Sequence, residues 1–99
     1  MTVMTEGRRY ASENGPYGLA VSLKGHDKGN IYVIMGYNEN RVCVADGRHS
    51  CIDAPKWKNK KHIQRLEGLS DNLKRLIAGA EHDSDLVYIL RCYRKESGV

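Results

Sequence analysis

The chain has 99 residues, which is enough for one compact domain and too few for two. It is 40% hydrophobic but contains no Phe and one Trp, so its core must be built from aliphatic side chains and tyrosine. The longest apolar run, residues 31–35, is far too short to cross a bilayer, which excludes a membrane span. The net charge is +4, and residues 18–65 hold the excess, with nine Lys/Arg against four Asp/Glu. Such an excess is typical of a surface that binds phosphates.

The three cysteines, Cys43, Cys51 and Cys92, are odd in number and show neither disulfide nor metal-ligand spacing. Residues 1–15 are polar and lack the apolar segment of a secretory signal. We therefore expect a reduced, cytoplasmic compartment, and no metal or other cofactor.

Residues 1–16 are polar without periodicity, and we interpret them as a flexible leader. The polarity then alternates with a period of two, as a half-buried strand requires. In the first strand Leu19 and Val21 share one face, and Ala20 and Ser22 share the other. Turns rich in Gly and Asn separate this strand from the next ones. The predicted strands are residues 17–24, 31–37, 41–45 and 50–53.

Short strands at close spacing, joined by glycine turns, predict a mainly β fold, namely a small antiparallel barrel over residues 17–69. Residues 56–62 are predicted to form a basic loop of this barrel. Ile63, Leu66 and Leu69 fit a short turn or strand that closes it.

A helical pattern follows. Ser70 is suited to be an N-cap and Gly79 a stop, and between them Leu73, Leu76 and Ile77 form one apolar stripe. These residues predict a first helix after the barrel.

A second helix is predicted to start at Asp83 or Ser84. Its apolar face consists of Leu86, Ile89, Leu90 and Tyr93. A strand is the alternative for residues 86–90, which form a continuous apolar run. We expect residues 70–99 to form a helical extension that packs on the barrel.

The segment 18–29, GLAVSLKGHDKG, joins an alternating strand to a glycine-rich turn. Backbone N–H groups in such a turn can cradle a phosphate. The segment is not a P-loop, because the GxxxxGK[ST] pattern is absent. An ordinary hairpin turn is the alternative.

Three landmarks follow one another: KGHDKG at 24–29, VADG at 44–47 and PKWKNKKH at 55–62. The strand, the turn ending in Lys-Gly and the second strand resemble the KOW motif of ribosomal proteins and transcription elongation factors, and Gly29 matches the motif's glycine. Together the landmarks resemble the small bacterial KOW-domain RNA-binding proteins, which are related to large-subunit ribosomal proteins. The resemblance covers residues 18–65, about half of the chain.

This resemblance implies an SH3-like barrel whose loops contact RNA. Asn30 and Asp53 depart from the pattern, because a basic or small residue and more positive charge are expected there. The residues that the resemblance assigns to the phosphate backbone are Lys24, His26, Lys28, Asn30, Arg48, Lys56, Lys58, Lys60 and Lys61.

The basic segment 56–65 has a physical argument of its own. Five cations lie in it, with Trp57 and His62 between them. Lysines neutralise phosphates and release counterions, and an exposed Trp can stack on an unpaired base. We therefore add Trp57, His62 and Arg65 to the candidate RNA-binding residues. The alternative is that Trp57 closes the core and the lysines only keep the loop soluble.

Metal binding and catalysis have little support. Cys43, His49, Cys51 and His62 could converge, but structural zinc sites show close Cys pairs. Ser22 lacks the context of a nucleophile elbow, and no cysteine has an evident activating base. We expect neither a metal site nor an enzyme.

The sequence thus predicts a cytoplasmic RNA-binding protein without catalysis. The resemblance makes ribosomal RNA or the ribosome the expected partner, with a role in translation. The alternative is a protein-interaction module that acts as an adaptor, with a protein partner bound by residues 70–99. Exposure of Leu86, Leu90 and Tyr93 would favour that alternative.

Overall fold

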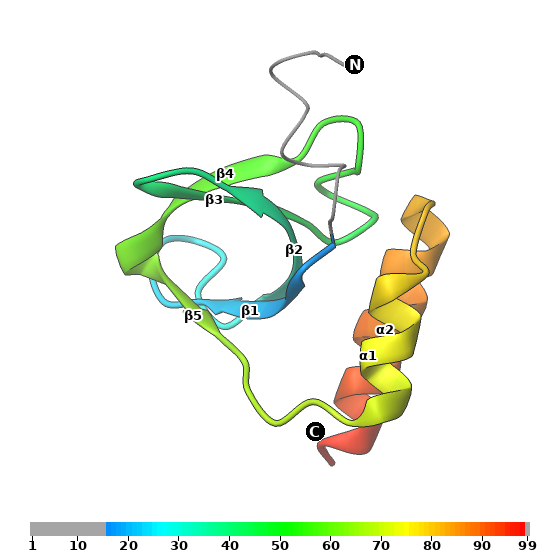
Figure 1. The fold of residues 1–99 in the computed structure, drawn as a ribbon. Coiled ribbons are helices and arrows are strands. Elements are labelled where there is room, and N and C mark those ends of the chain that lie inside the picture. The colour runs from blue at the N-terminus through cyan, green and yellow to red at the C-terminus, as the bar shows by residue number, and fades with distance from the viewer. Residues whose placement is uncertain (1–15, 99) are drawn as a thin grey trace.

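The structure, a computed structural model, describes residues 16–98. Within them, a five-stranded antiparallel sheet has the order β4-β3-β2-β1-β5, and two α-helices lie on one side of it (Figure 1). The strands are β1 (Gly18–Ser22), β2 (Ile31–Tyr37), β3 (Arg41–Ala45), β4 (Lys56–Asn59) and β5 (Ile63–Arg65). The helical elements are the 3-10 turn η2 (Lys60–His62), α1 (Asp71–Ala78) and α2 (Asp83–Glu96). Apart from Pro16, the leader predicted at residues 1–16 lies outside the described residues.

The alternating pattern located the first three strands correctly, and the predicted antiparallel sheet is confirmed. The prediction of a fourth strand at residues 50–53 was wrong, because that segment forms only an isolated bridge between Cys51 and Ala54. The fourth strand is β4, which lies inside the predicted basic loop. Its lysines alternate with Trp57, which lies opposite Cys43 of β3.

The sheet is strongly curled but open, which corrects the expectation of a closed barrel. The two edge strands, β4 and β5, follow each other in the chain across η2, and no pairing joins them among the described residues. A three-residue 3-10 turn brings the edges near each other without a ladder between them (Figure 1). A register shift between Ile34 and Gly36 of β2 interrupts the pairing with β3, as a bulge does where a sheet bends.

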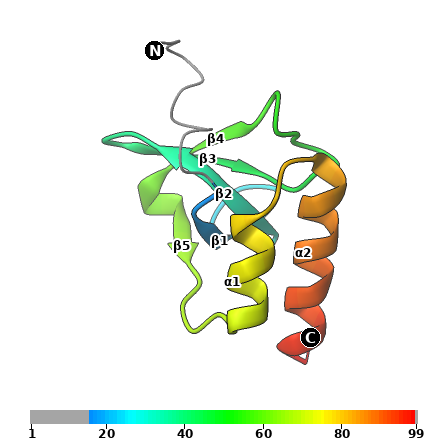
Figure 2. The same ribbon diagram turned by 45° about the vertical axis from the view of Figure 1, so that its right-hand side comes forward.

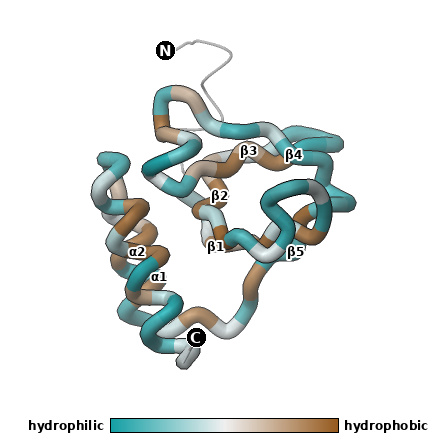
Figure 3. The backbone as a smooth tube through the Cα atoms, turned by 180° about the vertical axis from the view of Figure 1, so that it is seen from behind, coloured by the Kyte–Doolittle hydropathy of each residue, from teal (hydrophilic) through white to brown (hydrophobic). Residues whose placement is uncertain are grey.

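The curl gives the protein two hydrophobic clusters. The inner, concave face buries Ala20, Tyr32, Ile34, Val42 and Val44. The outer face packs against the helices, and its cluster consists of Leu19, Val33, Met35, Cys43, Ala45, Leu73, Ile77, Leu86, Ile89 and Leu90. Figure 3 shows the hydrophobic residues concentrated in the central strands and the helices, whereas the turn between β1 and β2 is mostly hydrophilic.

Both predicted helices are confirmed. Ser70 caps α1, because its hydroxyl accepts a hydrogen bond from the Leu73 N–H at 3.1 Å, and Gly79 ends the helix. Helix α2 starts at Asp83, so the alternative strand at residues 86–90 was wrong. The two helices lie side by side against the outer face of the sheet (Figure 2). In residues 16–98 no helix has the length and apolar character needed to cross a membrane.

Candidate nucleic-acid interface

The turn between β1 and β2 exposes the residues that the sequence assigned to it, Lys24, His26, Lys28 and Asn30. Three of its backbone N–H groups, however, are used within the turn. The N–H groups of Lys28, Gly29 and Asn30 donate to the carbonyl oxygens of Gly25, Ser22 and Asp27, at 3.2, 2.8 and 2.9 Å. These three N–H groups are therefore not available to cradle a phosphate.

Asp27 belongs to the same turn but lies at the inner face of the sheet. Its carboxylate is 2.6 Å from Lys58 Nζ and 3.7 Å from Lys56 Nζ, both on β4. It also accepts hydrogen bonds from the hydroxyls of Tyr32, at 2.6 Å, and Ser22, at 3.0 Å. We call Asp27, Lys56, Lys58, Tyr32 and Ser22 the inner network. Through it the first turn of the sheet is tied to the edge strand β4.

The inner network keeps its carboxylate charged. Burial alone would raise the pKa of Asp27, but hydrogen bonds from Lys58, Tyr32 and Ser22 outweigh it and hold this pKa well below the usual range. Burial, and then the bond to Asp27, raise the pKa of Tyr32 to about 12, so the hydroxyl remains a donor. Asp27 is therefore an anion at any physiological pH, and it offsets one of the two lysine charges beside it.

Four predicted binding residues of β4 and η2 differ in what surrounds them. The Lys58 side chain is only 16% exposed and is paired with Asp27, whereas Lys56 is 42% exposed and also faces Asp27. Lys60 and Lys61 are exposed, and Lys60 Nζ lies 5.8 Å from the ring centre of Tyr37, a cation–π distance. Lys56 and Lys58 thus share the single charge of Asp27, whereas Lys60 and Lys61 are exposed and have no carboxylate partner among the described residues.

The remaining candidates of this segment have structural contacts. Trp57 is half-buried and packs against the outer cluster beneath the helices, so the contacts favour its interpretation as a core residue. His62 is half-buried. Arg65 is exposed and donates from a guanidinium nitrogen to the Tyr17 carbonyl at 3.0 Å.

Arg48 lies on the turn that follows β3. One carboxylate oxygen of Asp46 accepts the backbone N–H groups of Arg48, His49 and Ser50, at 2.8, 2.8 and 3.0 Å. Burial would raise the pKa of Asp46, but these backbone hydrogen bonds outweigh it and lower the pKa. A carboxylate thus organises the turn and leaves the Arg48 side chain exposed.

This turn is fixed against the start of α2. Gly47 has φ +84°, and a Cβ atom there would overlap the Asp83 carbonyl oxygen, so only glycine allows the approach. The Asp83 carboxylate accepts the Ile52 N–H at 2.8 Å. The turn is therefore held in direct contact with the start of α2.

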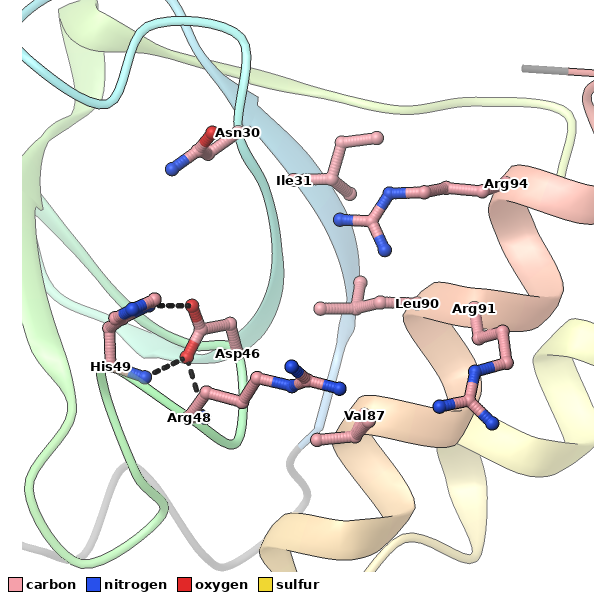
Figure 4. Close-up of a pocket in the computed structure, with 9 residues that line it drawn as sticks. All are labelled: Asn30, Ile31, Asp46, Arg48, His49, Val87, Leu90, Arg91 and Arg94. Carbon is pink, nitrogen blue, oxygen red and sulfur yellow. Dashed lines mark hydrogen bonds and ion pairs between the residues drawn. The ribbon is translucent and has the colours of Figure 1, made fainter.

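Beside this contact lies a cleft of about 390 Å³ between the sheet and α2 (Figure 4). Three arginines line it, with Arg48 on the turn and Arg91 and Arg94 on the helix. The other lining residues are Asn30, Ile31, Asp46, His49, Val87 and Leu90. We call this site the arginine cleft. It joins two predicted binding residues, Asn30 and Arg48, to two that the sequence analysis missed.

Arg91 and Arg94 were missed because cations near the end of a helix are usually explained by the helix dipole. A signal was present, however. They are three residues apart and, with Val87 and Leu90, follow the i, i+3, i+4, i+7 spacing of one helix face. What that face meets depends on tertiary packing alone.

No group of three or more His, Cys, Asp or Glu side chains that could hold a metal occurs among residues 16–98. Cys43 is buried in β3, and burial raises the pKa of its thiol to about 11, which keeps it protonated and weakly nucleophilic. No protein-family model matches the chain, and no curated protein matches it.

Proposed function

We propose that this protein binds structured RNA through exposed cations, without catalysis. The observation that carries the proposal is the distribution of ion pairs. Among the described residues only Lys56, Lys58 and His49 lie within ion-pair distance of a carboxylate. The carboxylate is Asp27 for the two lysines and Asp46 for His49. The cations left without a carboxylate partner include Lys24, Lys28, Arg48, Lys60, Lys61, Arg91 and Arg94.

These cations suit a polyanion better than a small acidic ligand. They lie on separate elements, namely the β1–β2 turn, the turn after β3, η2 and α2, and their side chains are exposed. A phosphate backbone can meet several of them at once, and each contact releases counterions from the nucleic acid. Binding by this route is electrostatic and needs no reacting group.

We further propose that the open, curled sheet has an SH3-like strand arrangement of the KOW type. The antiparallel order with β5 beside β1, and the turn ending in Lys28-Gly29, support this assignment. On the same resemblance the RNA is ribosomal, and the protein acts in the cytoplasm in association with the ribosome.

The adaptor alternative loses its main support. It required an exposed apolar face on the second helix, but Leu86 and Leu90 are buried against the sheet and Tyr93 is half-buried. Tyr88 is exposed on that helix, yet it stands outside this apolar face. The helix uses its apolar side to complete the core of its own domain.

The test is fluorescence anisotropy with a labelled RNA hairpin, measured from about 50 to 200 mM salt. We expect the logarithm of the affinity to fall linearly with the logarithm of salt concentration, with a slope of several units. An affinity that does not change over this range would contradict the proposal. A pull-down from lysate with and without RNase would then identify the bound RNA.

A further inference from the structure

We propose that the arginine cleft binds a phosphate group, and that the helix α2 is thereby part of the RNA interface. That the phosphate belongs to RNA rests on the proposed function, whereas the phosphate site itself rests on the cleft alone. The expected ligand is one nucleotide unit of the bound strand.

The first support is that three arginines line one cleft. Figure 4 shows the side chains of Arg48 and Arg94 extending into the cleft from opposite walls. Arg91 lines the cleft from the same helix face as Arg94, with its guanidinium turned along the helix. Guanidinium groups present planar pairs of donors that match phosphate oxygens. None of the three is ion-paired in the described part of the chain.

The second support is the balance of charge in the cleft. Its one carboxylate, Asp46, directs one oxygen to three backbone N–H groups, and the other lies 3.7 Å from His49 Nδ1. It therefore serves the turn and does not pair with an arginine. The three arginines outweigh this one carboxylate, and the net positive potential of the concave site favours a bound anion.

The third support is the shape of the site. A volume of about 390 Å³ is more than a phosphate ion alone needs. Ile31, Val87 and Leu90 add an apolar wall beside the arginines, which suits the sugar and base attached to a phosphate. The site is thus built for a nucleotide unit, and a mononucleotide should bind it more tightly than inorganic phosphate does.

The wall that carries Arg48 is fixed in place, so the site is pre-organised. Gly47 contacts α2 directly and Asp83 holds Ile52, as described above. Little ordering of the backbone should then accompany binding, which favours affinity.

The test compares two double variants with equal loss of charge. Arg91→Gln with Arg94→Gln removes the helix side of the cleft, and Lys74→Gln with Arg75→Gln removes two exposed cations of α1 outside it. At about 0.1 M salt we expect the first to weaken binding of the RNA hairpin about tenfold and to lower the salt slope by about 1. We expect the second to weaken it less than twofold.

Equal losses in the two double variants, or wild-type affinity in the first, would overturn the proposal. Because a surface substitution can still affect folding, Arg48→Gln provides a second variant on the other wall, and it should also weaken binding. Circular dichroism checks that each variant is folded.

A second measurement follows the arginine side-chain Nε–Hε signals by NMR at constant ionic strength. Inorganic phosphate, a 5′-mononucleotide and RNA hairpins with and without a 5′-phosphate are the probes. Saturable shifts of Arg48, Arg91 and Arg94 with the mononucleotide and with both hairpins support a site for an internal phosphate. Shifts with the 5′-phosphorylated hairpin alone would overturn the internal position.

If RNA fails to bind while the mononucleotide shifts these signals, the proposed function fails and the phosphate site stands without RNA. Absence of saturable shifts with every probe would overturn the site itself.

Discussion

Lys58 and Arg91 contribute equally to the formal charge of the chain, but the fold uses them in opposite ways. Lys58 lies at the inner face of the curled sheet, 16% exposed, with its ammonium 2.6 Å from the Asp27 carboxylate. Arg91 is exposed on α2, lines the arginine cleft and has no ion pair in residues 16–98. One cation stabilises the fold, and the other is available to a ligand.

The difference shows that a basic segment of a sequence is not yet a basic surface. The segment 56–61 has four lysines, but Asp27 from a distant turn faces two of them. The helix α2 looks like a packing element, yet it supplies two unpaired arginines to a cleft. Four experiments test this contrast, and they follow in order of expected effect.

The largest effect should come from Asp27→Asn, which removes the anion of the inner network and keeps its shape. Lys58 would then remain mostly buried without a counter-charge, and we expect a loss of about 3 kcal/mol in the free energy of unfolding. Urea denaturation near pH 7 measures it. The control is Asp53→Asn, an exposed carboxylate, which should change stability by no more than about 0.5 kcal/mol. Equal effects of the two variants would show that the inner network does not stabilise the fold.

The contact between the turn after β3 and the helix can be tested with two glycines of similar backbone geometry. Gly29 and Gly47 have φ of +92° and +84°, but a Cβ atom on Gly29 would meet nothing within 4 Å. We expect Gly29→Ala to cost about 1 kcal/mol from backbone strain alone. Gly47→Ala should cost about 2 kcal/mol more, because it also overlaps α2. Thermal unfolding of both variants provides the comparison, and equal costs would mean that the turn does not press on the helix.

The contrast between paired and unpaired lysines can be tested with Lys61→Gln and Lys56→Gln. Lys61 is exposed on η2, whereas Lys56 faces Asp27 at 3.7 Å. We expect Lys61→Gln to lower the salt slope of RNA binding by about 1 and the affinity by about three- to fivefold. Lys56→Gln should cause less than half of that decrease. Both affinities are measured by anisotropy with the RNA hairpin. A larger decrease for Lys56→Gln than for Lys61→Gln would show that Lys56 contacts RNA despite its contact with Asp27.

The pH dependence of stability gives a comparably small effect. The pKa of Asp27 is lower in the folded protein than its ordinary value, so the unfolded chain takes up the proton first as the pH falls. The stabilisation by Asp27 is therefore complete above about pH 5 and declines below about pH 4. The difference in stability between the wild type and Asp27→Asn should shrink by about 1 kcal/mol between about pH 5 and pH 3. Urea denaturation at several pH values measures it, and a constant difference would contradict it.

Local patterns were sufficient for most of the elements. Alternation located β1 to β3, and the Ser70 cap, the Gly79 stop and the apolar stripes located both helices. Strand β4 was missed for a physical reason. Its residues alternate correctly, but the inward positions are lysines, and charged residues face the inside of a sheet only when a partner is present. That partner is Asp27, some thirty residues earlier in the chain.

The candidate site was predictable only in part. Exposed turns follow from glycine and polar residues, and so the positions of Lys28 and Arg48 on turns were correct. The backbone hydrogen bonds inside the first turn and the ion pair of Lys58 with Asp27 could be known only from the tertiary structure. The same holds for the arginine cleft, because Arg48 and Arg91 are far apart in sequence and meet only when the helix packs on the sheet.

The sequence by itself determined the first three antiparallel strands, the two helices and the excess of positive charge. These depend on periodicity, on capping residues and on composition, all of which act over a few neighbouring positions. Only the tertiary structure decided that the sheet stays open and which cations remain unpaired. The reason is that a charge is neutralised or left free by the groups that folding brings within a few ångströms of it, and sequence separation does not limit which groups these are.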